Sequence, residues 1–213
     1  MIRLDHILWA APDLDEGERI FERLTGVAPA RGGVHPGFGT RNSLAALDYG
    51  AYFEIIAPDP AQDLTGNRGG RIAALARPGL LTFAVASNAL DALKVTGLNE
   101  GLTVRGPEKM HRATPSGGRL DWSILYLEHA DFGEAIPFVI DWDGTPHPSL
   151  STPQGCRLKS FAALHPDAER LSALYARLGV PVAVKRSIDP GFVAELATPR
   201  GDVVCLARLD RAP

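Results

Sequence analysis

The sequence has few cysteines, no long apolar run and no long run of like charge. Its two cysteines, Cys156 and Cys205, lie on separate segments, and neither belongs to a CxxC motif. This pattern excludes a finger-type structural zinc site, and without a secretory signal we expect both thiols to be reduced. No apolar segment approaches the roughly 20 residues of a membrane span. The chain passes from Met1 directly into a segment with charged residues, which is not typical of a signal peptide, so we expect a cytoplasmic protein.

Charge and motif content exclude several function classes. The 22 basic and 25 acidic residues give a net charge of −3, so neither a nucleic acid nor a membrane is expected as a partner. The sequence has no GxSxG nucleophile motif. Its glycine-rich stretch RGGVHPGFGTRN lacks the Lys-Ser/Thr of a phosphate-binding loop and the strand–helix setting of a dinucleotide site.

A strand–helix unit recurs three times along the chain. The units read LDHILWAAPDL, LLTFAVASNAL and LKSFAALHPDA and begin at Leu4, Leu80 and Leu158, at intervals of 76 and 78 residues. In the first unit Asp13 and a glutamate three residues later form a capping box, and Gly26 is a helix stop. A period this long favours repeated modules rather than a solenoid.

The segments after each unit predict the fold class. The first two units continue into three further extended segments, and the third continues into about two. We therefore expect an α+β fold of βαβββ modules, over residues 1–60 and 78–148, whose curled mixed sheets form a cup. A truncated third module, residues 157–213, would pack on the same domain. The polar stretches 58–71 and 104–118 are predicted to be a connector and a loop.

Two polar residues interrupt otherwise apolar strands. His6 lies in the first strand and Glu54 in the strand YFEII, where burial without a partner would cost several kcal/mol. An imidazole and a carboxylate suit Mn, Fe, Ni or Zn and leave positions open for a substrate. Without a metal, the pair could act as an acid–base dyad. The alternative is a purely structural hydrogen-bonded pair.

Two further segments carry candidate substrate-binding residues. His35, Thr40 and Asn42 lie in HPGFGTRN, where glycines allow close approach of a ligand; a plain loop is the alternative. Trp142 and His147 lie in DWDGTPHPS, which would form a wall of the cup, with His147 as a further metal ligand or proton donor. The alternative for this segment is a proline-fixed turn with a packed tryptophan.

The ordered set of motifs resembles a known superfamily. LDHILWAAPDL, HPGFGTRN, AYFEII, PFVIDWDGTPHP and TPRG, in this order, are similar to glyoxalase-like proteins of the vicinal oxygen chelate (glyoxalase/bleomycin resistance/dioxygenase) superfamily. The resemblance implies a cup that holds a divalent metal through the first and last strands of each module. His6 and Glu54 match the first ligand pair. In the second module Thr82 replaces the histidine, and Phe138 or Ile140 replaces the carboxylate, so two of four usual ligands are missing.

Two functions follow from these observations. The first is a glyoxalase-like enzyme that acts on a small oxygenated organic molecule by lyase or isomerase chemistry. In it His6 and Glu54, with or without a divalent metal, stabilise an enolate-like intermediate and move a proton. Oxygenation is less favoured, since it normally needs a two-histidine, one-carboxylate set that His35 or His147 would have to complete. The second is a metal-free small-molecule binding protein on the same scaffold. Related cups often pair between chains, which would make a homodimer.

Overall fold

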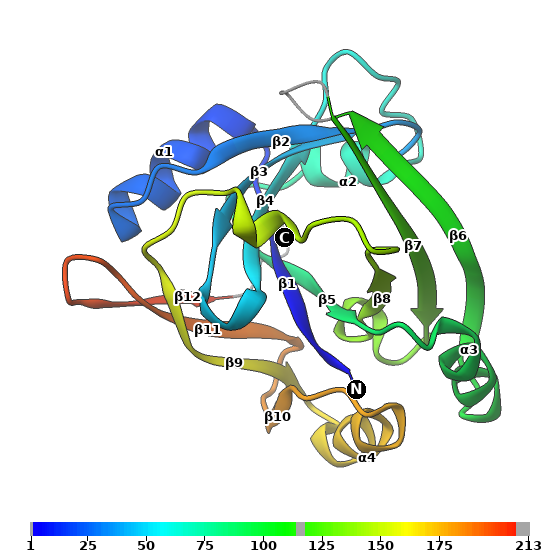
Figure 1. The fold of residues 1–213 in the computed structure, drawn as a ribbon. Helices are drawn as coiled ribbons and strands as arrows, with labels where there is room; N and C mark the ends of the chain where they lie inside the picture. The colour runs from blue at the N-terminus through cyan, green and yellow to red at the C-terminus, as the bar shows by residue number, and fades with distance from the viewer. Residues whose placement is uncertain (1, 114–117, 208–213) are drawn as a thin grey trace.

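The computed structural model describes residues 2–113 and 118–207, which form two sheets and several helices (Figure 1). The first module consists of β1 (Arg3–Ala10), α1 (Leu14–Thr25), β2 (Ala30–His35), β3 (Thr40–Ala46) and β4 (Tyr52–Pro58). The second consists of β5 (Gly79–Ala86), α3 (Leu90–Asn99), β6 (Thr103–Ala113), β7 (Arg119–Glu128) and β8 (Phe138–Asp141). A short helix, α2 (Arg68–Ala73), lies between them.

The two modules share one curled eight-stranded sheet. Its order is β2-β3-β4-β1-β5-β8-β7-β6, with β1 and β5 antiparallel at the centre. In each module the first strand pairs in parallel with the last one, β1 with β4 and β5 with β8. The sheet curls until its edge strands β2 and β6 come into contact, as Figure 1 shows. This confirms the predicted α+β cup of repeated βαβββ modules.

The third unit forms a smaller sheet with a different strand order. It consists of β9 (Arg157–His165), α4 (Ala168–Leu178), β10 (Ala183–Arg186), β11 (Gly191–Ala197) and β12 (Val203–Ala207). The order is β10-β9-β11-β12, so β9 pairs with the strand that follows its helix. The sequence predicts only the β11–β12 hairpin after the helix. It misses β10 because that strand has four residues, is largely exposed and shows no apolar alternation.

Strand alternation separates the core from the cup. In β1 and β4 the buried side chains of Ile7, Trp9, Phe53 and Ile55 belong to the main core, which also includes residues of α1, α3, α4 and the second sheet. The side chains between them, which include His6 and Glu54, face the concave side and line a cavity. Each strand therefore supplies the core with one face and the site with the other.

One local prediction is wrong. Residues 104–118 are predicted to be a loop, but up to Ala113 they belong to β6, an edge strand that tolerates basic residues because one side faces solvent. The stretch 58–71 connects the two modules, as predicted, and contains the start of α2, which Asn67 caps by accepting a hydrogen bond from the Gly70 N–H. The cap at Asp13 and the left-handed stop at Gly26 are confirmed.

Cys156 is buried and Cys205 is exposed, and both are free thiols. Within residues 2–113 and 118–207, no helix has the length and apolar character needed to cross a membrane. Short 3-10 turns lie at Asp48–Gly50, Gly133–Ala135 and Pro148–Leu150.

Candidate functional site

A register shift in β1 places two neighbouring polar side chains in contact. Alternation would point Asp5 and His6 to opposite faces of the sheet, but the pairing of β1 with β5 is irregular between Leu4 and His6. As a result, His6 Nδ1 lies 2.7 Å from Asp5 Oδ1. Both residues are buried, with 3% and 0% of their surface exposed.

The parallel neighbour β4 supplies the second carboxylate. His6 pairs with Tyr52 and Leu8 pairs with Glu54 across the two strands. This register stacks the His6 ring on the Tyr52 ring, with centroids 4.5 Å apart, and places His6 Nε2 3.3 Å from Glu54 Oε2. Each ring nitrogen of His6 therefore faces a carboxylate oxygen.

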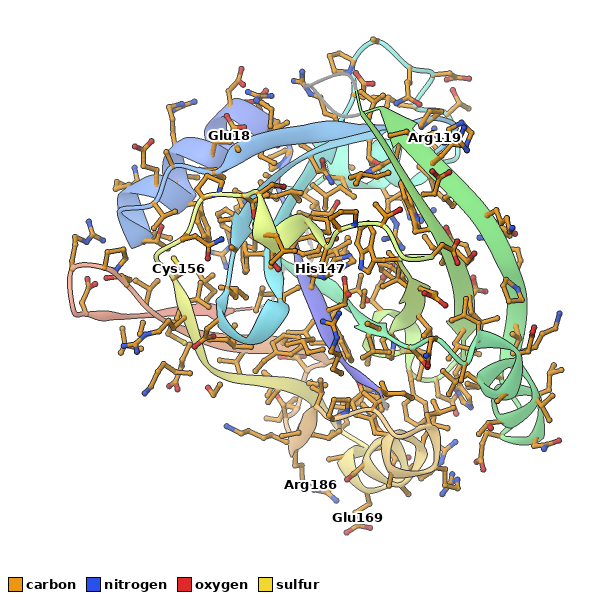
Figure 2. The ribbon with its side chains drawn as sticks, viewed as in Figure 1. Glu18, Arg119, His147, Cys156, Glu169 and Arg186 are labelled. Atoms are coloured by element: carbon orange, nitrogen blue, oxygen red, sulfur yellow. The ribbon has the colours of Figure 1, made fainter. Side chains whose placement is uncertain are left out.

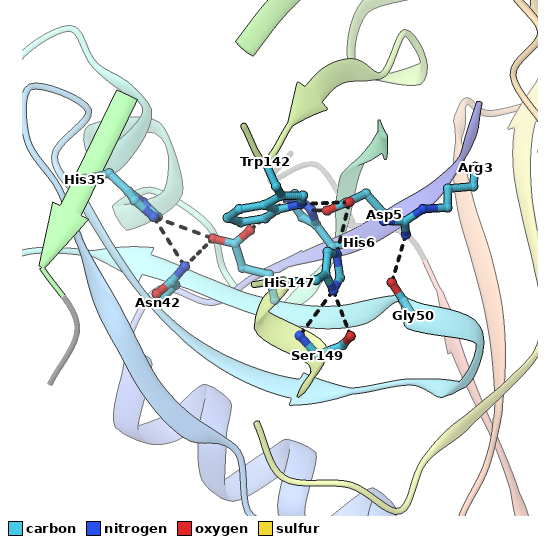
Figure 3. Close-up of polar contacts among 10 residues, drawn as sticks. Arg3, Asp5, His6, His35, Asn42, Gly50, Trp142, His147 and Ser149 are labelled. Atoms are coloured by element: carbon cyan, nitrogen blue, oxygen red, sulfur yellow. Dashed lines mark hydrogen bonds and ion pairs between the residues drawn. The ribbon is translucent and has the colours of Figure 1, made fainter. Parts of the chain in front are cut away.

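The segment after β8 completes the surroundings of Asp5 (Figure 3). Trp142 Nε1 donates to Asp5 Oδ2 at 3.0 Å, and His147 Nε2 lies 3.1 Å from the same oxygen. The Ser149 backbone N–H donates to His147 Nδ1, so the hydrogen of a neutral His147 is on Nε2 and is donated to Asp5.

Asp5 is held as a carboxylate by these contacts. Its burial alone raises its pKa. The hydrogen bonds from His147 and His6, together with the electrostatic attraction of those two rings, outweigh that effect and hold the pKa well below its usual value. An ionised Asp5 only accepts hydrogen bonds, so His6 Nδ1 carries a hydrogen.

A second network orients Glu54. Asn42 Nδ2 donates to Glu54 Oε1 at 2.7 Å, and the orientation of its amide is set because Oδ1 accepts the Gly33 N–H at 2.9 Å. The same Asn42 nitrogen lies 3.3 Å from His35 Nε2, which must accept. His35 Nδ1 then donates to Thr40 Oγ1 at 2.9 Å. Thr40, His35 and Asn42 form one chain that leads to the carboxylate.

The two networks define what lies between His6 and Glu54. The contact with Asp5 places a hydrogen on His6 Nδ1, and the hydrogen bond from Asn42 occupies Glu54 Oε1. His6 Nε2 and Glu54 Oε2 face each other at 3.3 Å, and two bare lone pairs in this position would repel. A shared proton or a cation between these atoms removes the repulsion.

The donor set does not fit the four-ligand metal site of the resemblance. The separation of His6 Nε2 and Glu54 Oε2 suits two ligands that each lie about 2.0–2.2 Å from one ion. In the second module, however, the Thr82 hydroxyl donates to the Glu134 carbonyl and Phe138 places an aromatic ring 5.4 Å from that of His6. Among the described residues, no group of three or more His, Cys, Asp or Glu side chains could hold a metal ion.

The site opens into a cavity of about 360 Å³ on the concave face of the sheet. Six of the seven site residues predicted from the sequence line it: His6, His35, Thr40, Asn42, Glu54 and Trp142. His147 is not among the lining residues; Figure 2 shows it on the segment between β8 and β9, and its ring contacts Asp5.

Sequence reasoning misses several residues of the site. Asp5 is the main one. The sequence does contain an indication of its role, because Asp5 is a second polar residue, next to His6, in an apolar strand. Tyr52, which stacks on His6, and Arg68 and Arg71, which line the cavity from α2, are also missed. The two arginines lie in a stretch that the sequence indicates only as a connector.

The curled sheet, with its His–Glu pair on the first and last strands of one module, defines a cup of the vicinal oxygen chelate type. The family model of the glyoxalase-like domain matches residues 4–179, and the chain belongs to this family. No curated protein matches the chain.

Solved structures support the fold. A hypothetical protein from Staphylococcus aureus is 16% identical, with a TM-score of 0.68 over 98% of this chain and 89% of that one. Methylmalonyl-CoA epimerase in complex with methylmalonyl-CoA and NH4+ is 19% identical, with a TM-score of 0.51 over 70% of this chain and 99% of that one. A variant of the Streptomyces coelicolor epimerase with 2-nitronate-propionyl-CoA is 19% identical, with a TM-score of 0.50 over 67% and 96%. At these identities the similarity shows the fold alone.

Proposed function

We propose that the chain is a glyoxalase-like lyase or isomerase that moves a proton at a carbon atom of a small oxygenated organic molecule. The observation that carries the proposal is the 3.3 Å approach of His6 Nε2 to Glu54 Oε2, both on the wall of the cavity. Two buried groups that share one proton form an acid–base pair, and each is oriented from behind by its own network.

Glu54, His6 and Asp5 would each have a separate role in the proposed proton transfer. Glu54 takes a proton from a carbon next to a carbonyl group, and the electron pair of the broken C–H bond passes to the carbonyl oxygen as an enolate. The N–H of His6 Nε2 donates a hydrogen bond to that oxygen. Asp5 holds His6 in position and stabilises its positive charge. Return of the proton to a different carbon, or to the other face, completes an isomerisation; loss of a leaving group completes a lyase reaction.

A divalent metal was the other expectation for this pair. His6 and Glu54 remain the two ligands we would assign to Mn, Fe, Ni or Zn, but Thr82 and Phe138 provide no further donor to the site. In the proposed reaction the side chains of His6 and Glu54 therefore act without a metal. A homodimer and a cytoplasmic location remain predictions from the sequence.

Deuterium exchange tests the proposal. The protein is incubated in D2O with a panel of small 2-oxo, 2-hydroxy and 3-oxo compounds, and loss of each C–H signal is followed by proton NMR. We expect catalysed exchange of at least one compound, with a decrease of about 10²–10⁴-fold in both His6→Gln and Glu54→Gln. Glu22→Gln makes the same chemical change on the exposed face of α1 and should have no effect.

The alternative function is a non-catalytic binding protein on the same scaffold. The two second-module positions that lack a metal donor motivate it. Such a protein would bind members of the panel with no exchange, and Glu54→Gln would change affinity only. Binding without exchange across the panel would therefore contradict the enzyme.

A further inference from the structure

The short helix α2 lies against the concave face beside the His6–Glu54 pair. Its Ile72 packs with Leu8 and Ile56, which follow His6 and Glu54 by two residues on the same strands. Because two residues along a strand span about 7 Å, Ile72 packs about 7 Å along the strands from the His6–Glu54 pair. Arg68 and Arg71, on the turn of α2 that precedes Ile72, line the same cavity as the pair.

Close backbone packing fixes the position of α2. The Gly69 N–H donates to the Phe38 carbonyl at 2.9 Å, and Asn67 caps the helix through the Gly70 N–H. A Cβ atom on Gly69 would lie 1.9 Å from the Gly39 carbonyl oxygen, a distance that no side chain can adopt. The glycines of this stretch let α2 approach the β2–β3 turn. Because this packing fixes the helix, it also fixes the backbone positions of Arg68 and Arg71.

The arginines of α2 are poorly neutralised. Within residues 2–113 and 118–207, the Arg71 side chain makes no ion pair or hydrogen bond. Arg68 has one acidic partner there, Glu134 at 3.8 Å, whose side chain is 48% exposed. By contrast, Arg105 on β6 pairs with Glu108 and lies over the Tyr126 ring. The α2 side of the cavity therefore carries positive charge that a ligand can neutralise.

The wall formed by β7 and β8 is mainly apolar, and Arg105, His111 and Glu128 line the cavity beside it. Trp122 and Ile124 on β7 and Phe138 and Ile140 on β8 form one continuous surface with Trp142. A guanidinium pair binds planar or tetrahedral oxyanions through charge-assisted hydrogen bonds, and an apolar wall accommodates a hydrocarbon body. The two arginines and this apolar surface thus line the same cavity.

We propose that Arg68 and Arg71 form the anion-binding end of the cavity, and that its substrate is an organic anion with an apolar body. The anionic group is a carboxylate or a phosphate monoester, and it directs the body of the molecule along the wall towards His6 and Glu54. The proposal rests on the proposed function, since it names the substrate class of that site.

Binding of matched fluorinated probes tests the proposal by fluorine NMR. The probes are 4-fluorophenylacetate, 4-fluorobenzyl phosphate and the neutral 4-fluorophenylacetamide. We expect at least one anion to bind about tenfold or more tightly than the amide, and Arg68→Gln/Arg71→Gln to abolish this preference. Whichever anion binds more tightly identifies the carboxylate or the phosphate. Arg19→Gln, on the exposed face of α1, removes the same charge per site and should leave the preference intact.

The outcomes separate this inference from the proposed function. Equal binding of amide and anions, retention of the preference in the double variant, or no binding of either anion at millimolar concentration would overturn the anion site. His6→Gln and Glu54→Gln should lose deuterium exchange and keep the anion preference. A preference without any exchange would support the anion site and contradict the enzyme.

Discussion

Asp5 Oδ1 lies 2.7 Å from His6 Nδ1, although the two residues are neighbours in one strand. Side chains of adjacent strand residues normally point to opposite faces, and here the irregular pairing of β1 with β5 overrides that rule. The contact assigns the hydrogen of His6 to Nδ1 and leaves Nε2 to face Glu54. In the proposed reaction Asp5 is therefore a positioning residue that acts through His6.

Asp5→Asn should reduce both stability and activity. The substitution leaves His6, Trp142 and His147 directed at an amide, and disruption of such a buried network costs about 2–4 kcal/mol in the free energy of unfolding. An amide can also place His6 in the wrong tautomer, so exchange should fall by about 10²-fold or more at unchanged binding of the fluorinated probes. Urea unfolding and NMR exchange measure the two effects. Asp91→Asn, on exposed α3, is the control.

Acid stability should depend on Asp5. Because the folded-state pKa of Asp5 lies below its unfolded value, the unfolded chain binds its proton first as the pH falls. The contribution of Asp5 is complete above the unfolded pKa of about 4 and is lost as the pH falls through that value towards the folded pKa. In chelator-treated protein, Asp5→Asn should flatten the dependence of unfolding free energy on pH below about 4. Parallel curves for wild type and variant would contradict this assignment.

Trp142→Phe separates the hydrogen bond to Asp5 from ring packing. The indole N–H donates to Asp5 Oδ2 at 3.0 Å, and phenylalanine keeps an aromatic ring without that donor. Trp122 belongs to the same apolar cluster and makes no hydrogen bond through its side chain to the described residues. Trp142→Phe should therefore destabilise the protein by about 1 kcal/mol more than Trp122→Phe in chemical unfolding. Equal losses would mean that the indole hydrogen bond contributes nothing.

Gly69→Ala tests whether anion binding by Arg68 and Arg71 depends on the position of α2. The added methyl group would collide with the Gly39 carbonyl, so α2 must move away from the β2–β3 turn. We expect a loss of about 1–3 kcal/mol in unfolding free energy together with a weaker preference for the anionic probes. A stable variant with an unchanged preference would show that the position of α2 does not matter for binding.

The sequence predicts the parts of the site that depend on residue type within strands. His6 and Glu54 are polar residues in apolar strands, and their facing positions follow from the repeated module. The parallel register of β1 and β4 then brings them together. The glycine-rich segment is also predicted, because the resemblance to glyoxalase-like proteins implies that it faces the cup, and His35 and Asn42 do line the cavity.

The missed parts depend on tertiary contacts. The role of Asp5 requires a register shift that no local pattern predicts. Helix α2 has six residues, two of them glycine, and is held by the backbone of the β2–β3 turn rather than by its own propensity. His147 contacts Asp5 because of the path that the chain takes after β8, and no local sequence pattern predicts that path.

The most direct test is deuterium exchange before and after metal removal, with metal content measured by plasma mass spectrometry on the same samples. The protein is purified without chelator or immobilised nickel, beside His6→Ala and Glu54→Ala. If a proton lies between His6 Nε2 and Glu54 Oε2, exchange by the wild type persists after chelation and is lost in both variants. Near-stoichiometric metal that both variants lose, with exchange abolished by the chelator, would contradict this account and assign the position between the two residues to a cation.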